Sequence, residues 1–94
     1  MSTAGNFIIL IVADTFLCND FEYSLRISQQ DFSFVCSDSL FEGNMLRFRA
    51  LASIKLFEYA INQGGDRVIN FYLLAQALQS LSNAFQIYDA EDQK

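Results

Sequence analysis

The chain of 94 residues lacks histidine, proline and tryptophan, and it contains only two cysteines and four glycines. Without histidine the commonest general base is missing, and neither serine–histidine nor cysteine–histidine pairs can form within one chain. The cysteines lack zinc-site spacing, no glycine-rich phosphate loop is present, and the acidic residues do not match a calcium loop. We therefore expect a protein that is not an enzyme and that has no catalytic residues, no metal and no cofactor.

Basic residues are also scarce. The chain has six lysines and arginines and eleven aspartates and glutamates, which give a net charge of −5. An acidic chain repels phosphate backbones, so we expect no direct binding to nucleic acid and a protein with a basic surface as the partner. The alternative is that the charge serves solubility alone. The predicted acidic contact surface consists of the six acids of residues 1–44, namely Asp14, Asp20, Glu22, Asp31, Asp38 and Glu42.

Two cysteines, Cys18 and Cys36, are too few for a disulfide framework. Both lie beside apolar residues, which favours buried reduced thiols, while a single bridge between neighbouring strands would need an oxidising compartment. The apolar run Phe7–Ala13 has no preceding lysine or arginine and is too short to span a bilayer. The longer segment 68–88 contains amide side chains that would be costly in lipid. We expect a cytoplasmic protein without membrane contact.

Charge is absent from the 21 residues 68–88, where large apolar side chains recur at spacings of 3, 4, 3, 4 and 3. This seam consists of Phe71, Leu74, Leu78, Leu81, Phe85 and Tyr88. Such spacing is typical of a helix that packs along its length against another helix. The seam either packs on the preceding helix or a sheet, or it mediates self-association. The opposite face is polar but uncharged, whereas a solvated helix face normally carries lysine and glutamate.

Three strands are predicted in the first part of the chain. Residues 6–13 form a continuous apolar run, which suits a strand buried on both faces. Residues 21–27 alternate apolar and polar side chains, and residues 32–36 resume this alternation, which is typical of strands with one buried face. These segments predict a short antiparallel meander.

Two helices are predicted to follow. The first begins at Ser39, which has the capping-box partner Glu42, or equally at Asn44, and the glycines at 64–65 end it. Asp66 is a suitable N-cap for the second helix. The predicted fold is a single two-layer α+β domain spanning residues 1–94. In it, a three-stranded antiparallel β-meander precedes an antiparallel helical hairpin packed on one face, in the order β-β-β-α-α. Residues 1–5 and 89–94 are expected to be mobile.

Apolar residues make up 52% of the chain, which is more than a small monomer easily buries, so we expect a homodimer formed through helix surfaces. Arg49 lies within an apolar arc and needs a carboxylate or carbonyl partner, which lies either inside the chain or across an interface. Apolar residues at the first turn of the last helix form a small patch. The predicted interface comprises Arg49, Val68, Ile69, Tyr72, Gln76, Gln79, Asn83 and Gln86.

These features favour a non-enzymatic protein–protein interaction module. The leading hypothesis is a small acidic inhibitor, of the antitoxin, immunity or phage anti-defence type, that blocks a basic site on a larger nucleic-acid-handling protein. A bacterial or phage context fits this hypothesis. One alternative is a homo-oligomeric assembly or adaptor subunit. Another is a small-ligand-binding domain with a pocket lined by phenylalanine and tyrosine between sheet and helices.

Overall fold

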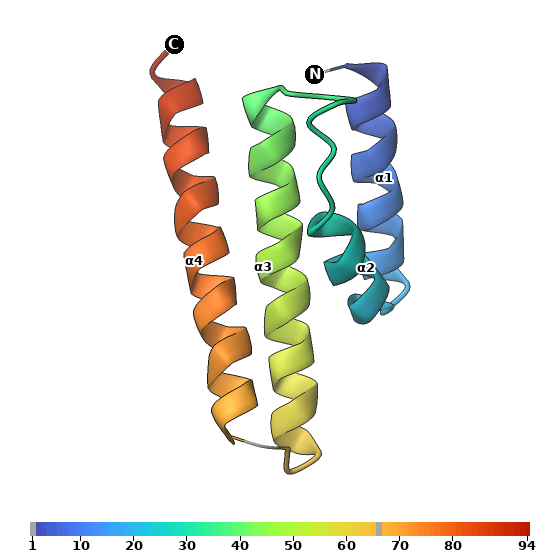
Figure 1. Cartoon of the computed structure of the whole chain (residues 1–94), viewed down its shortest axis with the longest axis vertical. Helices are drawn as coiled ribbons and strands as arrows, with labels where there is room; N and C mark the ends of the chain where they lie inside the picture. Colours follow the sequence, from blue (N-terminus) through green and yellow to red (C-terminus); the bar gives the residue numbers. More distant parts are fainter. Residues whose placement is uncertain (1, 66) are drawn as a thin grey trace.

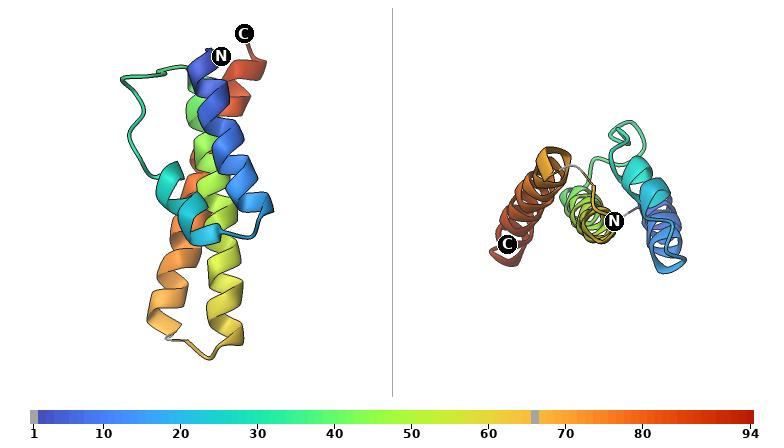
Figure 2. Two further views of the ribbon diagram at one scale, coloured as in Figure 1. Left: turned by 90° about the vertical axis from the view of Figure 1, so that its right-hand side faces the viewer. Right: turned by 90° about the horizontal axis from the view of Figure 1, so that it is seen from below.

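Four α-helices make up the part of the chain that the computed structural model describes, which is residues 2–65 and 67–94 without the side chains of Arg67 and Ile69. The helices are α1 (Thr3–Leu17), α2 (Phe21–Ser28), α3 (Ser39–Asn62) and α4 (Arg67–Asp92). The long helix α3 lies between α4 and α1, and the short helix α2 packs beside α1 and α3 (Figure 1). Viewed along the helices, α4, α3 and α1 form a row (Figure 2). Among the described residues, α4 contacts no helix except α3.

The predicted α+β fold is wrong, because the described residues contain no strand and therefore no meander or two-layer arrangement. Residues 6–13 lie within α1, residues 21–27 form most of α2, and residues 32–36 belong to a turn-rich connection. The helical part of the prediction agrees with the structure, since residues 44–62 lie in α3 and residues 68–88 lie in α4. These two helices form an antiparallel hairpin (Figure 1).

Helix α1 begins where the Ser2 side chain accepts a hydrogen bond of 3.1 Å from the Gly5 amide. A serine at this position satisfies one of the amides that the first helical turn leaves without a partner. The following apolar run fits a helix as well as a strand, because it has no polar residue that would reveal a period. In the structure Val12 is fully buried, whereas Leu10 and Leu17 are exposed.

Residues 21–27, predicted as a strand from their alternating apolar and polar side chains, lie in helix α2. Its N-cap is Asp20, whose side chain accepts a first-turn amide. Ser24 and Ser28, predicted to face solvent, are buried one helical turn apart. The Ser28 hydroxyl donates to the Leu25 carbonyl at 2.8 Å, and the Ser24 hydroxyl lies 3.5 Å from the Val12 carbonyl. Burial of a serine is inexpensive when its hydroxyl has such an acceptor.

The segment between α2 and α3 is held by local hydrogen bonds. The Asp31 carboxylate accepts the Ser33 amide at 2.9 Å, and the Phe32 carbonyl accepts the Cys36 amide at 2.9 Å. These bonds turn the chain, so that Cys36 and Phe32 face inward, whereas Phe34 is exposed. The residues therefore cannot share the single strand face on which the alternation placed them.

Helix α3 begins one residue later than its N-cap, Asp38, whose carboxylate accepts the Leu40 amide at 2.8 Å. The predicted start at Ser39 agrees with the first residue of α3, but the N-cap is Asp38 and not Ser39, and the alternative start at Asn44 is wrong. The predicted glycine stop is confirmed, because Gly64 has φ +71°, a left-handed conformation that glycine adopts without strain. The predicted N-cap of the last helix, Asp66, lies outside the described residues.

The core lies between α3, α1 and the connection that precedes α3. Val12, Cys36, Phe41 and Met45 are buried together, and partly buried residues of α1 and α2 pack around them. On α3, Phe48 faces the same side and meets Phe16 with ring centroids 6.2 Å apart. This cluster involves no residue of α4, so the last helix depends on a separate contact.

That separate contact is a close pairing of α4 with α3 through small side chains. Ala77, Ser80 and Ala84 of α4 are buried, at spacings that place them on one helix face. On α3, a Cβ atom at Gly43 would lie 3.1 Å from Tyr88 Cε1 and 3.2 Å from an Ile87 methyl group. Small residues allow the two helices to approach closely, and they leave the large residues of α4 elsewhere on its surface.

Candidate protein-binding surfaces

The outer face of α1 carries an exposed apolar stripe. Phe7, Leu10 and Leu17 are 65%, 65% and 78% exposed, and Ile11 is also exposed. Because α1 lies at one edge of the row of helices, α3 and α2 cover only part of its circumference (Figure 2). A helix with apolar residues on all sides is normally covered all round, so this stripe is a candidate contact surface.

Acidic residues lie within and beside this α1 stripe. Asp14 falls at helical spacing between Leu10 and Leu17, and it is exposed. Asp20 and Glu22 follow at the start of α2 and are exposed as well. Within the described part of the chain, none of these three carboxylates forms an ion pair. The outer face of α1 therefore combines a large apolar area with the Asp14 carboxylate, and Asp20 and Glu22 add negative charge at the start of the next helix.

The other three predicted acidic residues lie elsewhere, so the six acids form two groups and not one continuous surface. Asp31, Asp38 and Glu42 line a cavity of about 460 Å³ between the connection that precedes α3 and α3 itself. The Ser33 amide, by donating to the Asp31 carboxylate, lowers the pKa of that carboxyl below its usual value. Asp38 serves as the N-cap of α3.

A guanidinium and a thiol line the same cavity. Arg49 donates from Nη2 to the Ser28 carbonyl at 2.9 Å. Of the two predicted alternatives, its partner therefore lies inside the chain and not across an interface. Its Nε atom is buried without a hydrogen-bond partner, and burial lowers the pKa of the guanidinium. Hydrogen bonds from the Ser2 side chain and then the Asp38 backbone lower the pKa of the Cys36 thiol. A site of this size could hold a small molecule with a hydrogen-bond acceptor near Arg49.

The predicted apolar seam of α4 does not pack uniformly on α3. Phe71, Leu78 and Phe85 are 65%, 58% and 63% exposed, whereas Leu74, Leu81 and Tyr88 are half-buried. The seam therefore does not pack along its whole length on α3, because the small residues of α4 occupy that contact, and self-association through the seam stays a prediction. We name Phe71, Leu78 and Phe85 the α4 stripe.

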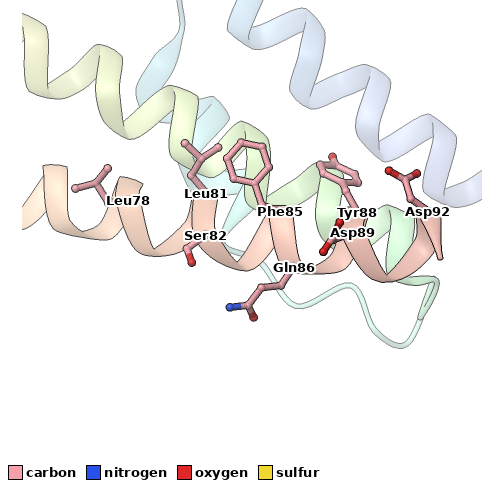
Figure 3. Close-up of a pocket in the computed structure, with 8 residues that line it drawn as sticks. All are labelled: Leu78, Leu81, Ser82, Phe85, Gln86, Tyr88, Asp89 and Asp92. Atoms are coloured by element: carbon pink, nitrogen blue, oxygen red, sulfur yellow. The ribbon is translucent and has the colours of Figure 1, made fainter.

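A shallow groove of about 590 Å³ runs along the C-terminal half of the α4 stripe. Figure 3 shows Leu81, Phe85 and Tyr88 pointing to one side of α4, while Gln86 points to the other. Tyr88 is anchored, because its hydroxyl donates to Asn44 Oδ1 of α3 at 2.6 Å. The groove therefore has an apolar floor fixed by the contact between α3 and α4.

The polar residues predicted as an interface form short-range pairs along α4. Gln76 Nε2 donates to the Tyr72 hydroxyl, and Gln79 Nε2 donates to Asn83 Oδ1, both at 3.0 Å. Gln86, Val68 and Tyr72 are exposed, and the side chain of Ile69 lies outside the described residues. Arg49 lies away from this group, on α3 beside α2. The structure therefore does not unite the eight predicted residues on one surface, and their role in an interface stays a prediction.

Two features of these surfaces were missed in the sequence. The α1 stripe was missed because residues 6–13 were predicted to form a strand buried on both faces, which would leave none of their side chains exposed. The exposure of the α4 stripe had a signal, because Ala77 and Ala84, seven residues apart, mark the face that packs most closely on a neighbouring helix. Of the two free thiols, Cys36 is buried as predicted, whereas Cys18 is exposed.

Comparison with known proteins found no matching family model, no matching curated protein and no matching solved structure. Across residues 2–65 and 67–94, no cluster of three potential metal-binding side chains is found. None of the helices in that part is long and apolar enough to cross a membrane.

Proposed function

We propose that this chain is a small acidic, non-enzymatic interaction protein that acts in the cytoplasm by binding a larger protein through the outer face of α1. The observation that carries this proposal is the α1 stripe with Asp14 inside it. Leu10 and Leu17 are exposed on either side of that carboxylate. Such a face fits a groove with apolar walls and a basic residue, because an amphipathic helix laid in a groove uses anchors at this spacing.

Basic sites are common on proteins that handle nucleic acids, because their lysine and arginine side chains neutralise phosphates. Asp14, Asp20 and Glu22 would occupy the positions of phosphates and accelerate association with such a site. Binding would then exclude the nucleic acid sterically. The proposed mechanism is therefore inhibition by occlusion, and it requires no catalytic group on this chain.

The test is affinity capture from cells of the source organism, with cross-linking and mass spectrometry to locate the contact. We expect one predominant partner with a basic nucleic-acid-binding site, cross-linked near α1. In direct binding assays, Leu10→Ala should weaken the affinity about 10-fold, and Asp14→Asn should slow association at low salt. Leu78→Ala, an exposed leucine on α4, is the matched control and should leave the affinity unchanged.

Inhibition of the captured partner can be measured with the same variants. Adding the purified chain should inhibit nucleic-acid binding by the captured partner, and Leu10→Ala should inhibit less. A partner that has no basic site, or one that is bound equally well by both α1 variants, would contradict the proposal.

A second candidate function is binding of a small molecule in the cavity of about 460 Å³ that Arg49 lines together with Asp31, Asp38 and Glu42. The buried Nε atom of Arg49 is a donor that an acceptor atom of such a ligand would satisfy, and the carboxylates favour a basic group elsewhere on it. A thermal-shift screen against nucleotide and metabolite panels should then give a stabilising ligand whose effect disappears in Arg49→Gln. No stabilisation by any compound of the panels would exclude this candidate.

A further inference from the structure

We infer that the α4 stripe binds a second copy of this chain, with the two α4 helices antiparallel about a two-fold axis at Leu78. The proposed function assigns the outer face of α1 to a different protein and assigns no role to α4. The α4 dimer goes beyond that function and uses a separate surface. It assigns to α4 a named occupant, an orientation and a register.

The first support is the symmetry of the α4 stripe about Leu78. Phe71 lies seven residues before Leu78 and Phe85 lies seven residues after it. In an antiparallel pair centred there, each Leu78 meets the Leu78 of the other copy, and each Phe71 meets a Phe85. The three exposed positions of one copy are therefore all covered by the same three positions of the other, as an isologous interface requires.

The second support is the fit of large residues to small ones between those contacts. Leu74 is four residues before Leu78, and Ser82 is four residues after it. Ala75 and Leu81 are related in the same way, three residues on either side. The antiparallel register thus sets each half-buried leucine opposite a small, exposed residue, so that the helices can interdigitate without two bulky side chains competing for one space.

The third support is the charge pattern, which favours this orientation over a parallel one. The nearest charged residues in the sequence are Arg67, eleven residues before Leu78, and Asp89, eleven residues after it. In a parallel pair the two copies of Asp89 would lie side by side, whereas the antiparallel register sets these two carboxylates at opposite ends of the interface. Between them α4 carries no charge, so two molecules of net charge −5 can meet there without burying an ion.

The α1 stripe is the competing surface for a second copy, and its chemistry is less suitable. Asp14 lies inside that stripe, and neither α1 nor the turn after it contains a lysine or arginine. Two copies paired through α1 would therefore bury two carboxylates without a basic partner, which is costly. The α4 stripe has no such group. Among the described residues α4 contacts α3 and no other helix, so the side of α4 that faces away from α3 is accessible to another helix (Figure 1).

The first experiment measures the mass of the full chain in solution by light scattering and sedimentation. We expect twice the 10.7 kDa of the chain at micromolar to millimolar concentration. Leu78→Glu and Leu78→Lys should each give a monomer, because each sets two like charges against each other at the two-fold axis. Mixing these two variants should restore the dimer, which shows that both are folded. Leu10→Glu, at an equally exposed leucine of α1, is the matched control and should remain dimeric.

The second experiment tests orientation by disulfide formation in a Cys18→Ser background. Phe71→Cys alone should not cross-link on mild oxidation, because the two copies of residue 71 lie at opposite ends of the interface. A mixture of Phe71→Cys and Phe85→Cys should give a cross-linked heterodimer. Efficient cross-linking of Phe71→Cys to itself would show a parallel pair and overturn the inference.

Two further outcomes would overturn the inference, and they differ in what they imply for α1. A wild-type monomer at millimolar concentration would remove the α4 dimer and leave binding through α1 intact. A dimer broken by Leu10→Glu but not by Leu78→Glu would assign self-association to α1. Only this second result also contradicts the proposed function.

Discussion

The Tyr88 hydroxyl, near the end of α4, donates a hydrogen bond of 2.6 Å to Asn44 Oδ1 near the start of α3. Next to Asn44, Gly43 provides the space into which the Tyr88 ring fits. One turn further along α4, Glu91 accepts a hydrogen bond from the Ser39 hydroxyl. These contacts join the two long helices at the end of the hairpin opposite its loop. They also hold the groove of the α4 stripe in shape.

Replacing Tyr88 by phenylalanine should lower the free energy of unfolding by about 1 kcal/mol, because the substitution removes the hydrogen bond and leaves the partly buried Asn44 without it. Denaturant unfolding followed by circular dichroism measures this difference. Tyr72→Phe is the control, since Tyr72 is exposed and its hydroxyl accepts from Gln76 in a hydrogen bond that is open to solvent. Equal losses in the two variants would show that the contact with Asn44 contributes nothing.

Replacing Ser53 by alanine should stabilise the chain by about 1 kcal/mol. Its hydroxyl is completely buried and has no hydrogen-bond partner among the described residues, and alanine is also the better helix former. Ser28→Ala is the matched comparison, because that buried hydroxyl donates to the Leu25 carbonyl at 2.8 Å. We expect Ser28→Ala to be the less stable of the two in thermal unfolding. The reverse order would contradict the assignment of an unsatisfied hydroxyl to Ser53.

The sequence predicted the long helices better than the short ones, for a physical reason. Residues 68–88 have a seam that repeats over three heptads, and no strand has that period. The run 6–13 has no period, because almost every residue in it is apolar, and only the Ser2 cap indicates a helix. In α2 the decisive fact is tertiary, since Ser24 and Ser28 are buried against neighbours that the local pattern does not reveal.

The candidate surfaces were predictable to a smaller degree than the helices. The seam identified the large apolar residues of α4, but not which of them α3 would cover. Coverage depends on how closely two helices approach, and Ala77, Ala84 and Gly43 determine that distance from both sides. The acidic contact surface of six residues stays a prediction, and the structure divides the six acids into two groups because of the turn between α2 and α3. No spacing along the chain encodes that turn.

The two thiols should react at different rates with an alkylating reagent. Cys18 is exposed, whereas Cys36 is buried in the core cluster. A lowered pKa would favour the thiolate of Cys36, but reaction also requires access, and Cys36 is only 8% exposed although it lines the cavity beside Arg49. We expect Cys18 to be modified first and Cys36 much more slowly, as followed by intact and peptide mass spectrometry. Rapid modification of Cys36 in the native protein would contradict the packing of residues 32–36.

The Glu91 carboxylate should contribute stability that is lost in acid. Hydrogen bonds from Lys94 first, and then from Ser39, lower the pKa of Glu91 in the folded chain below its usual value. The folded state therefore prefers the charged form, so this contribution is complete above the unfolded pKa and disappears as the pH falls through the folded pKa.

Wild type should therefore unfold at a higher temperature than Glu91→Gln at pH 7, and the two melting temperatures should converge toward pH 3. Lys94→Gln is the second variant. At pH 7 its melting temperature should lie between those of wild type and Glu91→Gln, because the Ser39 hydroxyl still donates to the Glu91 carboxylate. Subtracting the melting temperatures of wild type and Glu91→Gln at each pH removes the contribution of the other carboxylates, which titrate in both proteins. A difference that stays constant from pH 7 to pH 3 would mean that Glu91 stabilises the hairpin through its shape and not through its charge.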